Sequence, residues 1–243
     1  MNIIKLDAID STNDFLKELS KNQVVENFTA VVAENQTNGK GQMGATWKSE
    51  TGKNLIMSLL VSDILSNVDE IFHLNVAVSL SVVQVLEEFK LPKLTIKWPN
   101  DILSDTNKIC GILIENSIKS DSKIESVVGI GLNVNQKKFE NLPKASSLFV
   151  VMQKEFNLDT ILNRIVFQIK KNCSLILSNQ EEKLWKEFHK YIFKLNVPMP
   201  FEDADKNRFM GIIQLVTKDG KLQVVLEDDS VKTFGIKEIQ MLY

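Results

Sequence analysis

Lys97-Trp98-Pro99-Asn100-Asp101, followed by Lys108-Ile109-Cys110-Gly111-Ile112-Leu113, is the most informative stretch of this chain of 243 residues. Lys97 and Lys108 stand at the edges of apolar strand candidates, where burial can hold a cation near a bound phosphate. The alternative is a pair of solvent-exposed lysines, which is how most lysines occur in proteins. By themselves the two segments leave an anion site and a plain strand pair both open.

A polar loop is predicted from 35 to 52, with Gly39-Lys40-Gly41-Gln42-Met43-Gly44 at its centre. Glycines let the backbone curl so that successive N–H groups face one anion. The segment has the spacing of neither a dinucleotide fingerprint nor a P-loop. A flexible connection is the alternative, since many surface loops are no more than that.

A second glycine-bearing segment, Gly129-Ile130-Gly131-Leu132-Asn133, falls inside a strand candidate. Glycine in a strand indicates the close approach of a ligand or of another backbone, and the amide of Asn133 can read a base edge or a ureido group. A bulge without any ligand is the alternative. Each of these signals is weak when taken alone.

Strand and helix candidates alternate around these segments, which predicts a mixed α/β fold. Ser11 followed by Asp14 resembles a capping box and predicts the start of the first helix. After Pro198 and Pro200 the pattern changes to short strands, with Asp219-Gly220 as a hairpin signal. Strands are predicted at 3–6, 29–33, 55–61, 94–98, 109–115, 124–134, 212–217 and 222–226, helices at 10–19, 68–89, 160–177 and 181–193, and turns near 99–101, 104–107 and 120–122.

The charge balance and the rare residue types exclude several classes of protein. Lys and Arg number 29 against 31 Asp and Glu, so no net charge draws the whole chain to nucleic acid or to an anionic membrane. Two cysteines and two histidines exclude a disulfide framework and a zinc cluster, and Cys110 is expected in the core. With no basic leader and no apolar run near ~20 residues, we expect a cytoplasmic protein.

Taken together, the segments resemble the biotin protein ligases, also called biotin–acetyl-CoA-carboxylase ligases, and they follow the order of that family's motifs. The resemblance covers about residues 7–150 by motif and the short-stranded C-terminal tail by position, and its lysine-bearing motifs are highly specific. The matching motifs are Ser11-Thr12-Asn13, Gly39 to Trp47, Asn54-Leu55-Ile56-Met57-Ser58-Leu59, Lys97 to Asp101, Lys108 to Leu113, and Gly129 to Asn133.

The resemblance implies a fold and an activity. Residues 1–194 would form a biotin/lipoate ligase-like catalytic domain, a mixed sheet flanked by helices, and residues 195–243 a small SH3-like β-barrel. The enzyme would activate biotin with Mg²⁺ and ATP to biotinyl-5'-AMP, releasing pyrophosphate. It would then transfer biotin to one lysine of the biotin carboxyl carrier protein of acetyl-CoA carboxylase or of another biotin-dependent carboxylase.

The resemblance also implies a role for each matching residue. Lys108 would be the catalytic cation that bridges the biotin carboxylate and the α-phosphate. No certain metal site of the protein itself is implied, because Mg²⁺ would arrive with ATP. The implied biotin contacts are Ser11, Thr12, Asn13, Gln36, Lys40, Gly41, Gln42, Lys108, Gly111 and Leu113. The implied contacts of ATP and the adenylate are Trp47, Lys97, Asn100, Asp101, Gly129, Gly131 and Asn133.

The glycine-rich loop departs from the family pattern. Lys40 and Gln42 stand where the family usually has arginines, and Met43 replaces a residue that is often basic. We expect the adenylate to leak faster than in an arginine-bearing relative, which a comparison of intermediate half-lives with Gln42→Arg would test. Only ten residues precede Ser11, so we expect no DNA-reading domain and no repressor activity, and no membrane partner; a homodimer through edge strands is compatible with the resemblance.

Two other functions stay open at this point. A lipoate or octanoyl-type acyl ligase would share the fold and the acyl-transfer logic. A non-catalytic sensor of biotin or nucleotide is the second alternative, although a lysine between two anions is of little use to a protein that only binds. An assay of pyrophosphate exchange with biotin or lipoate distinguishes a biotin ligase from a lipoate or octanoyl-type ligase. Labelling of a carrier protein distinguishes a ligase from a sensor that only binds.

Overall fold

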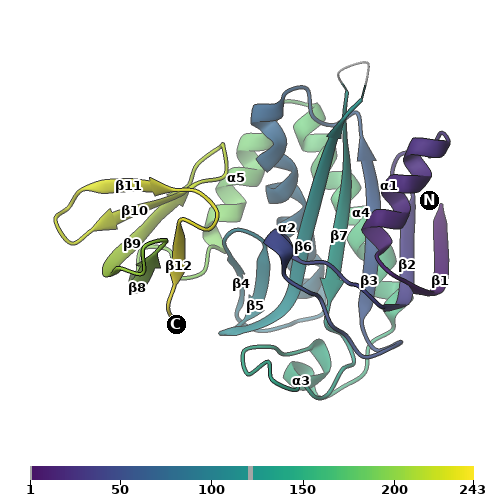
Figure 1. The fold of residues 1–243 in the computed structure, drawn as a ribbon, viewed down its shortest axis with the longest axis horizontal. Helices are drawn as coiled ribbons and strands as arrows, with labels where there is room; N and C mark the ends of the chain where they lie inside the picture. The colour runs from purple at the N-terminus through teal and green to yellow at the C-terminus, as the bar shows by residue number, and fades with distance from the viewer. Residues whose placement is uncertain (1, 120–122) are drawn as a thin grey trace.

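A seven-stranded mixed sheet forms the larger part of the fold (Figure 1). The computed structural model describes residues 2–119 and 123–243, so the turn predicted at 120–122 lies outside the described residues. The strand order is β1-β2-β3-β7-β6-β5-β4, with β1 and β2 parallel and the other pairs antiparallel. The strands are β1 (Ile3–Ile9), β2 (Ala30–Gln36), β3 (Leu55–Ser62), β4 (Leu94–Lys97), β5 (Asp101–Ser104), β6 (Asn107–Ile118) and β7 (Ile124–Leu132).

Helices cover both faces of this sheet (Figure 1). On one face Leu16 of α1 packs in a small cluster with Val31, Leu60 and Val127. The other face carries α2, α4 and α5, which pack on one another and on the main core. The helices are α1 (Thr12–Asn22), α2 (Ile71–Glu88), α3 (Leu148–Met152), α4 (Leu158–Leu177) and α5 (Glu181–Lys190), with single 3₁₀ turns at Gln42–Gly44 and Val68–Glu70.

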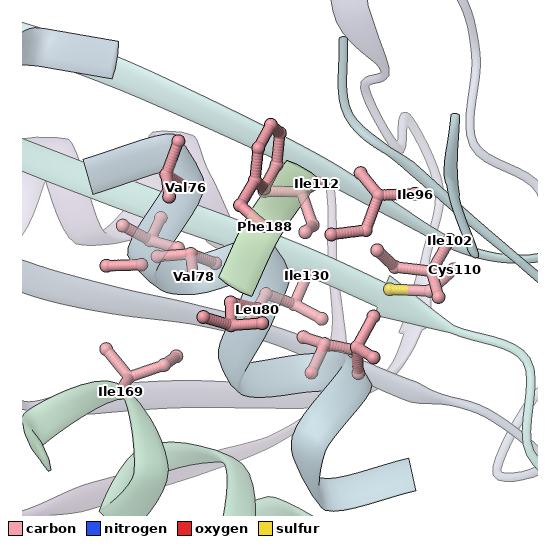
Figure 2. Packing of buried hydrophobic residues seen from close by; sticks show 14 of the residues in the cluster. Val76, Val78, Leu80, Ile96, Ile102, Cys110, Ile112, Ile130, Ile169 and Phe188 are labelled. Atoms are coloured by element: carbon pink, nitrogen blue, oxygen red, sulfur yellow. The ribbon is translucent and has the colours of Figure 1, made fainter. Parts of the chain in front are cut away.

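The main core lies between the sheet and the helices α2, α4 and α5. Figure 2 shows members of this cluster from α2 (Val78 and Leu80), from β7 (Ile130) and from α5 (Phe188). The stretch Val68–Glu88 is long and apolar enough to cross a membrane by length and composition, but 67% of that window is buried inside the protein. A helix that is apolar all round and packed on its neighbours is the core helix of a folded domain.

A second, five-stranded antiparallel sheet follows the helices, in the order β11-β10-β9-β8-β12 (Figure 1). The predicted hairpin is present, because Gly220 turns between β9 and β10 with a φ of +84°. Trp98 Nε1 donates to Gly220 O at 2.9 Å, which attaches this hairpin to the larger sheet. The sheet is open in this strand order, so a closed SH3-like barrel is not confirmed. The strands are β8 (Pro198–Asp203), β9 (Arg208–Val216), β10 (Leu222–Leu226), β11 (Val231–Phe234) and β12 (Ile239–Met241).

The predicted capping of the first helix is confirmed, since Ser11 Oγ accepts the backbone N–H of Asp14 at 3.3 Å. The helix predicted to reach 193 ends at Lys190 instead, because Tyr191 O accepts from Ile96 N at 2.7 Å and the chain joins the edge of β4. Residue 101 was predicted in a turn, yet it opens β5, which pairs with both β4 and β6. These differences arise from long-range pairing that local residue preference does not contain.

Candidate active site

A hollow lies on the α1 face of the sheet because residues without side chains meet there. Gly131 pairs with Gly111 across β7 and β6, and Gly129 stands two residues further along the same strand. Side chains alternate between the two faces of a strand, so these positions share the face of Val127, which packs under α1. The result is a cavity of about 260 Å³, and we call it the first cavity.

The glycine-rich loop, residues 39–47, covers this hollow. Trp47 N donates to Gly39 O at 2.8 Å, and the backbones of Lys40 and Thr46 form an isolated antiparallel β-bridge, so the loop closes on itself. The indole of Trp47 lies so close to Gly131 that a Cβ there would be 2.5 Å from its Cε2. Its Nε1 is buried and has no hydrogen-bond partner in the described part of the chain. Glycine at 131 is therefore needed for the loop to close.

Buried polar side chains gather at one end of the first cavity, where α1 begins. Thr12 donates to Gln36 Oε1 twice, from its backbone N at 2.8 Å and from its Oγ1 at 3.0 Å. Ser58 Oγ lies 2.7 Å from Thr12 Oγ1 and 2.6 Å from Asn13 Oδ1. These hydrogen bonds fix a set of amide and hydroxyl groups that can bind a small planar polar group with both donors and acceptors.

A lysine and a carboxylate meet at the other end of the first cavity. Lys108 Nζ lies 2.6 Å from Asp101 Oδ1, and about a third of the lysine side chain is exposed. The pairing of β5 and β6 shifts between Ile102 and Leu103, which marks a β-bulge. By strict alternation residues 108 and 111 would face opposite sides, but the bulge turns Lys108 so that its Nζ comes within 3.3 Å of the Cβ position of Gly111.

A second cavity, of about 390 Å³, adjoins the first. The residues that line both cavities are Thr46, Trp47, Asp101 and Lys108. The amine of Lys108 therefore stands where the two cavities meet. The remaining lining residues of the second cavity are Lys48, Asn133, Phe139, Leu142, Pro143, Lys144, Ala145 and Tyr243.

Three of the predicted nucleotide residues have structural contacts of their own. Asn100 Nδ2 donates to Ile112 O at 2.5 Å, and Asn133 Nδ2 donates to Ser146 O at 2.9 Å. Lys97 lines neither cavity; its Nζ lies 4.9 Å from the centre of the Tyr243 ring. Burial lowers the pKa of Lys97 below its ordinary value of 10.5, although Asp101 opposes this shift.

The structure brings most of the predicted site residues together. Every implied biotin contact lines the first cavity, and so do Trp47, Asn100, Asp101, Gly129 and Gly131. Asn133 lines the second cavity, and Lys97 is the exception. The roles of these residues stay predictions. The effect of Met43, which stands where the family often has a basic residue, also stays a prediction, and the Met43 side chain lies outside the described part of the chain.

Sequence reasoning did not single out Ser58, Glu115 or Tyr243 as site residues. Ser58 stood inside a quoted motif, and Glu115 follows Leu113 by two residues on the same face of β6, so strand alternation could have found both. Tyr243 lies two residues beyond the end of β12, and nothing local in the sequence connects it to the second cavity. Cys110 is fully buried and burial raises the pKa of its thiol, which confirms its expected place in the core.

Comparison with known proteins agrees with this geometry. The model of the Biotin/lipoate A/B protein ligase family matches residues 6–135. The bifunctional ligase/repressor BirA of Bacillus subtilis (strain 168) is 37% identical over 134 residues, which are 55% of this chain, and the match spans only 41% of that relative. BirA of Escherichia coli (strain K12) is 28% identical over 233 residues, 93% of this chain and 69% of that protein. A solved structure, the biotin protein ligase from Aquifex aeolicus in complex with biotin and ATP, has a TM-score of 0.82 at 26% identity and covers 99% of this chain and 98% of its own.

Proposed function

The chain belongs to the biotin/lipoate A/B protein ligase family, and from that premise we propose that it is an ATP-dependent biotin protein ligase. A carboxylate oxygen of biotin attacks the α-phosphorus of ATP, and pyrophosphate leaves. The ε-amine of a carrier lysine then attacks the acyl carbon of biotinyl-5'-AMP, AMP leaves, and the amine loses a proton. The observation that carries the proposal is the position of Lys108 at the junction of the two cavities.

The first cavity supports the binding of biotin. A ureido ring offers two N–H donors and one carbonyl acceptor, which suit the fixed hydroxyl and amide groups of Thr12, Asn13 and Gln36. We assign Ser11, Lys40, Gly41, Gln42, Gly111 and Leu113 to the same ligand, since they line the same cavity. The carboxylate of the ligand would then lie at the end of the cavity that holds Lys108.

Lys108 is the residue to which we assign the chemical step. The two reacting groups are both anions, so a cation between them lowers their repulsion and stabilises the charge that develops on the phosphate. Asp101, at 2.6 Å, holds the amine in place before the substrates arrive. Lys108 does not have to donate or accept a proton in this step, because its ammonium group acts through its charge.

The second cavity supports nucleotide binding. Of the residues we assign to the nucleotide, Trp47, Asp101 and Asn133 line this cavity. We keep Gly129 and Gly131 with the adenylate and Asn100 with the polyphosphate side, although they line the first cavity, and Lys97 with the polyphosphate side, although it lines neither. In the described part of the chain no three His, Cys, Asp or Glu side chains are grouped closely enough to hold a metal ion. A single carboxylate suits Mg²⁺ that arrives on the phosphates of ATP, where it would neutralise phosphate charge.

The finer assignments belong to the same proposal. We propose a catalytic domain of residues 1–194 and a C-terminal domain of residues 195–243 that closes as an SH3-like barrel. The acceptor would be the biotin carboxyl carrier protein of acetyl-CoA carboxylase or of another biotin-dependent carboxylase, in the cytoplasm. Neither DNA nor a membrane is proposed as a partner, and the free edge of β1 would permit a homodimer.

Mass spectrometry of a carrier domain tests the proposal directly. After incubation with this chain, biotin and Mg-ATP, the carrier should gain one biotinyl group, and Lys108→Ala should add none in the same time. Exchange of labelled pyrophosphate into ATP, measured with biotin, lipoate or octanoate, distinguishes a biotin ligase from a lipoate or octanoyl-type ligase. Exchange with lipoate only, or binding of biotin without any labelling of the carrier, would contradict a biotin ligase.

A further inference from the structure

A chain of alternating charges links the glycine-rich loop to the polar end of the first cavity. Lys40 Nζ lies 2.5 Å from Asp14 Oδ2, and Lys17 Nζ lies 2.9 Å from Asp14 Oδ1. Lys17 also contacts Glu115 Oε1 at 2.7 Å, and Glu115 Oε2 accepts from Asn13 Nδ2 at 2.8 Å. These charged side chains thus connect the loop, through the first turns of α1, to strand β6 and the wall of the first cavity.

We infer that Asp14 is a positioning residue, which holds Lys40 and with it the glycine-rich loop over the first cavity. Lys40 is the only cation between residues 39 and 47, so the loop has a single charged group by which an acid can hold it. The inference deepens the proposed function and rests on it only for its effect on biotin. The contact itself belongs to the protein without ligand.

The local structure makes Asp14 a rigid anchor. Its backbone N–H is held by the cap residue Ser11, and the first turn of a helix favours an acidic side chain. Burial raises the pKa of Asp14, but hydrogen bonds from Lys40 and Lys17 outweigh burial and leave the pKa below its ordinary value. Asp14 is therefore ionised at neutral pH.

The neighbouring charges explain why Lys17 does not take the place of Lys40. Lys17 already spans Asp14 and Glu115, and its two contacts lie within 2.9 Å. Each oxygen of Asp14 meets a different lysine, Oδ1 facing Lys17 and Oδ2 facing Lys40. Removal of the charge at 14 leaves Lys17 with Glu115, whereas Lys40 keeps no ion pair among those the structure describes.

Hydrogen–deuterium exchange of the segment 39–47 tests this anchor without any ligand. Asp14→Asn should speed exchange of the segment about 1.5- to 5-fold, the range for an ion pair that is about 40% exposed on each side. Asp14→Glu, which keeps the charge, should stay near wild type. Glu18→Gln is the matched control, since Glu18 lies on the same helix and bonds only to Asn22 among its described contacts.

Coupling to Lys40 separates an anchor from a general loss of helix stability. In a Lys40→Met background, Asp14→Asn should leave the loop exchange unchanged, because the partner is already gone. In kinetic assays Asp14→Asn should raise the KM for biotin by the same 1.5- to 5-fold with a smaller change in kcat. Unchanged loop exchange in Asp14→Asn, an equal effect in the Lys40→Met background, or tighter biotin binding would each overturn the inference.

Failure of the proposed function would look different. If wild type catalyses no biotin-dependent pyrophosphate exchange, the ligase assignment is wrong, but the deuterium measurement still decides whether Asp14 anchors the loop.

Discussion

Replacing Gly131 with alanine measures how tightly the glycine-rich loop is seated on the sheet. A Cβ at 131 would lie 2.5 Å from Cε2 of Trp47, whereas ordinary contact begins at 3.4 Å, so the indole must move by about 0.9 Å. The backbone cannot give way, because Gly131 is paired with Ile56 on one side and Gly111 on the other. Overpacking of this kind costs about 1–3 kcal/mol.

Two measurements follow from that displacement. Tm should fall by about 2–4 °C for each kcal/mol in a chain of this size. Biotin-dependent pyrophosphate exchange should fall about 10²-fold, since a misplacement near 1 Å has that effect on a positioned group. Gly111→Ala is the graded control for Tm alone, because its Cβ would lie 3.2 Å from Trp47 Cζ3 but also 3.3 Å from Nζ of Lys108; its Tm should fall less than that of Gly131→Ala.

A double variant tests whether the Trp47 indole causes this loss. In a Trp47→Leu background, where the ring is gone, Gly131→Ala should lose most of its effect on Tm. If Gly131→Ala unfolds at the wild-type Tm, or costs as much in the Trp47→Leu background, the indole does not lie on residue 131.

Three substitutions and one measurement of thiol reactivity test other parts of the structure. Lys108→Ala should slow biotin-dependent pyrophosphate exchange by about 10²–10³, the usual loss for one group that stabilises developing charge. Ser58→Ala should lower the free energy of unfolding by about 1–3 kcal/mol in urea titrations, because the buried hydroxyl contacts two buried polar groups. Burial lowers the pKa of Lys97, so folding disfavours its charge at neutral pH and this penalty fades as pH rises toward 10.5; Lys97→Met should therefore be more stable than wild type at pH 7, by a margin that shrinks at pH 10. Burial raises the pKa of Cys110, and that of Cys173 to about 12, so a disulfide reagent such as DTNB should react with neither thiol at pH 8 until urea unfolds the chain.

Each of these expectations has its contrary result. A Lys108→Ala enzyme at wild-type rate would remove the amine from the chemistry. A Ser58→Ala protein with an unchanged urea midpoint would show that the hydrogen bonds of this hydroxyl do not stabilise the fold. A Lys97→Met margin that grows between pH 7 and pH 10 would reverse the sign of the linkage. Fast thiol reaction in the native protein would show that a cysteine is accessible.

Local signals predicted the elements of the larger sheet well, and the structure extended or trimmed them at their ends. The start of α1 could be predicted from the sequence because its cap is a contact between Ser11 and Asp14, three residues apart. The strand β5 could not be predicted from the sequence, since its four residues are held by pairing with β4 and β6 rather than by their own β propensity. The position of Tyr243 beside the second cavity was equally hidden, because it depends on how the two sheets pack.

What the sequence determined by itself is the chemistry available: which lysines, amides and glycines exist, and in what order along the chain. The tertiary structure decided which of them meet. The bulge between β5 and β6 turns Lys108 toward Gly111, and the pairing of β7 with β6 sets two glycines side by side beneath Trp47. Asp14 and Lys40 become partners only when the loop folds back on α1. Residue type is a local property of the chain, whereas strand register and side-chain direction depend on segments far apart in sequence.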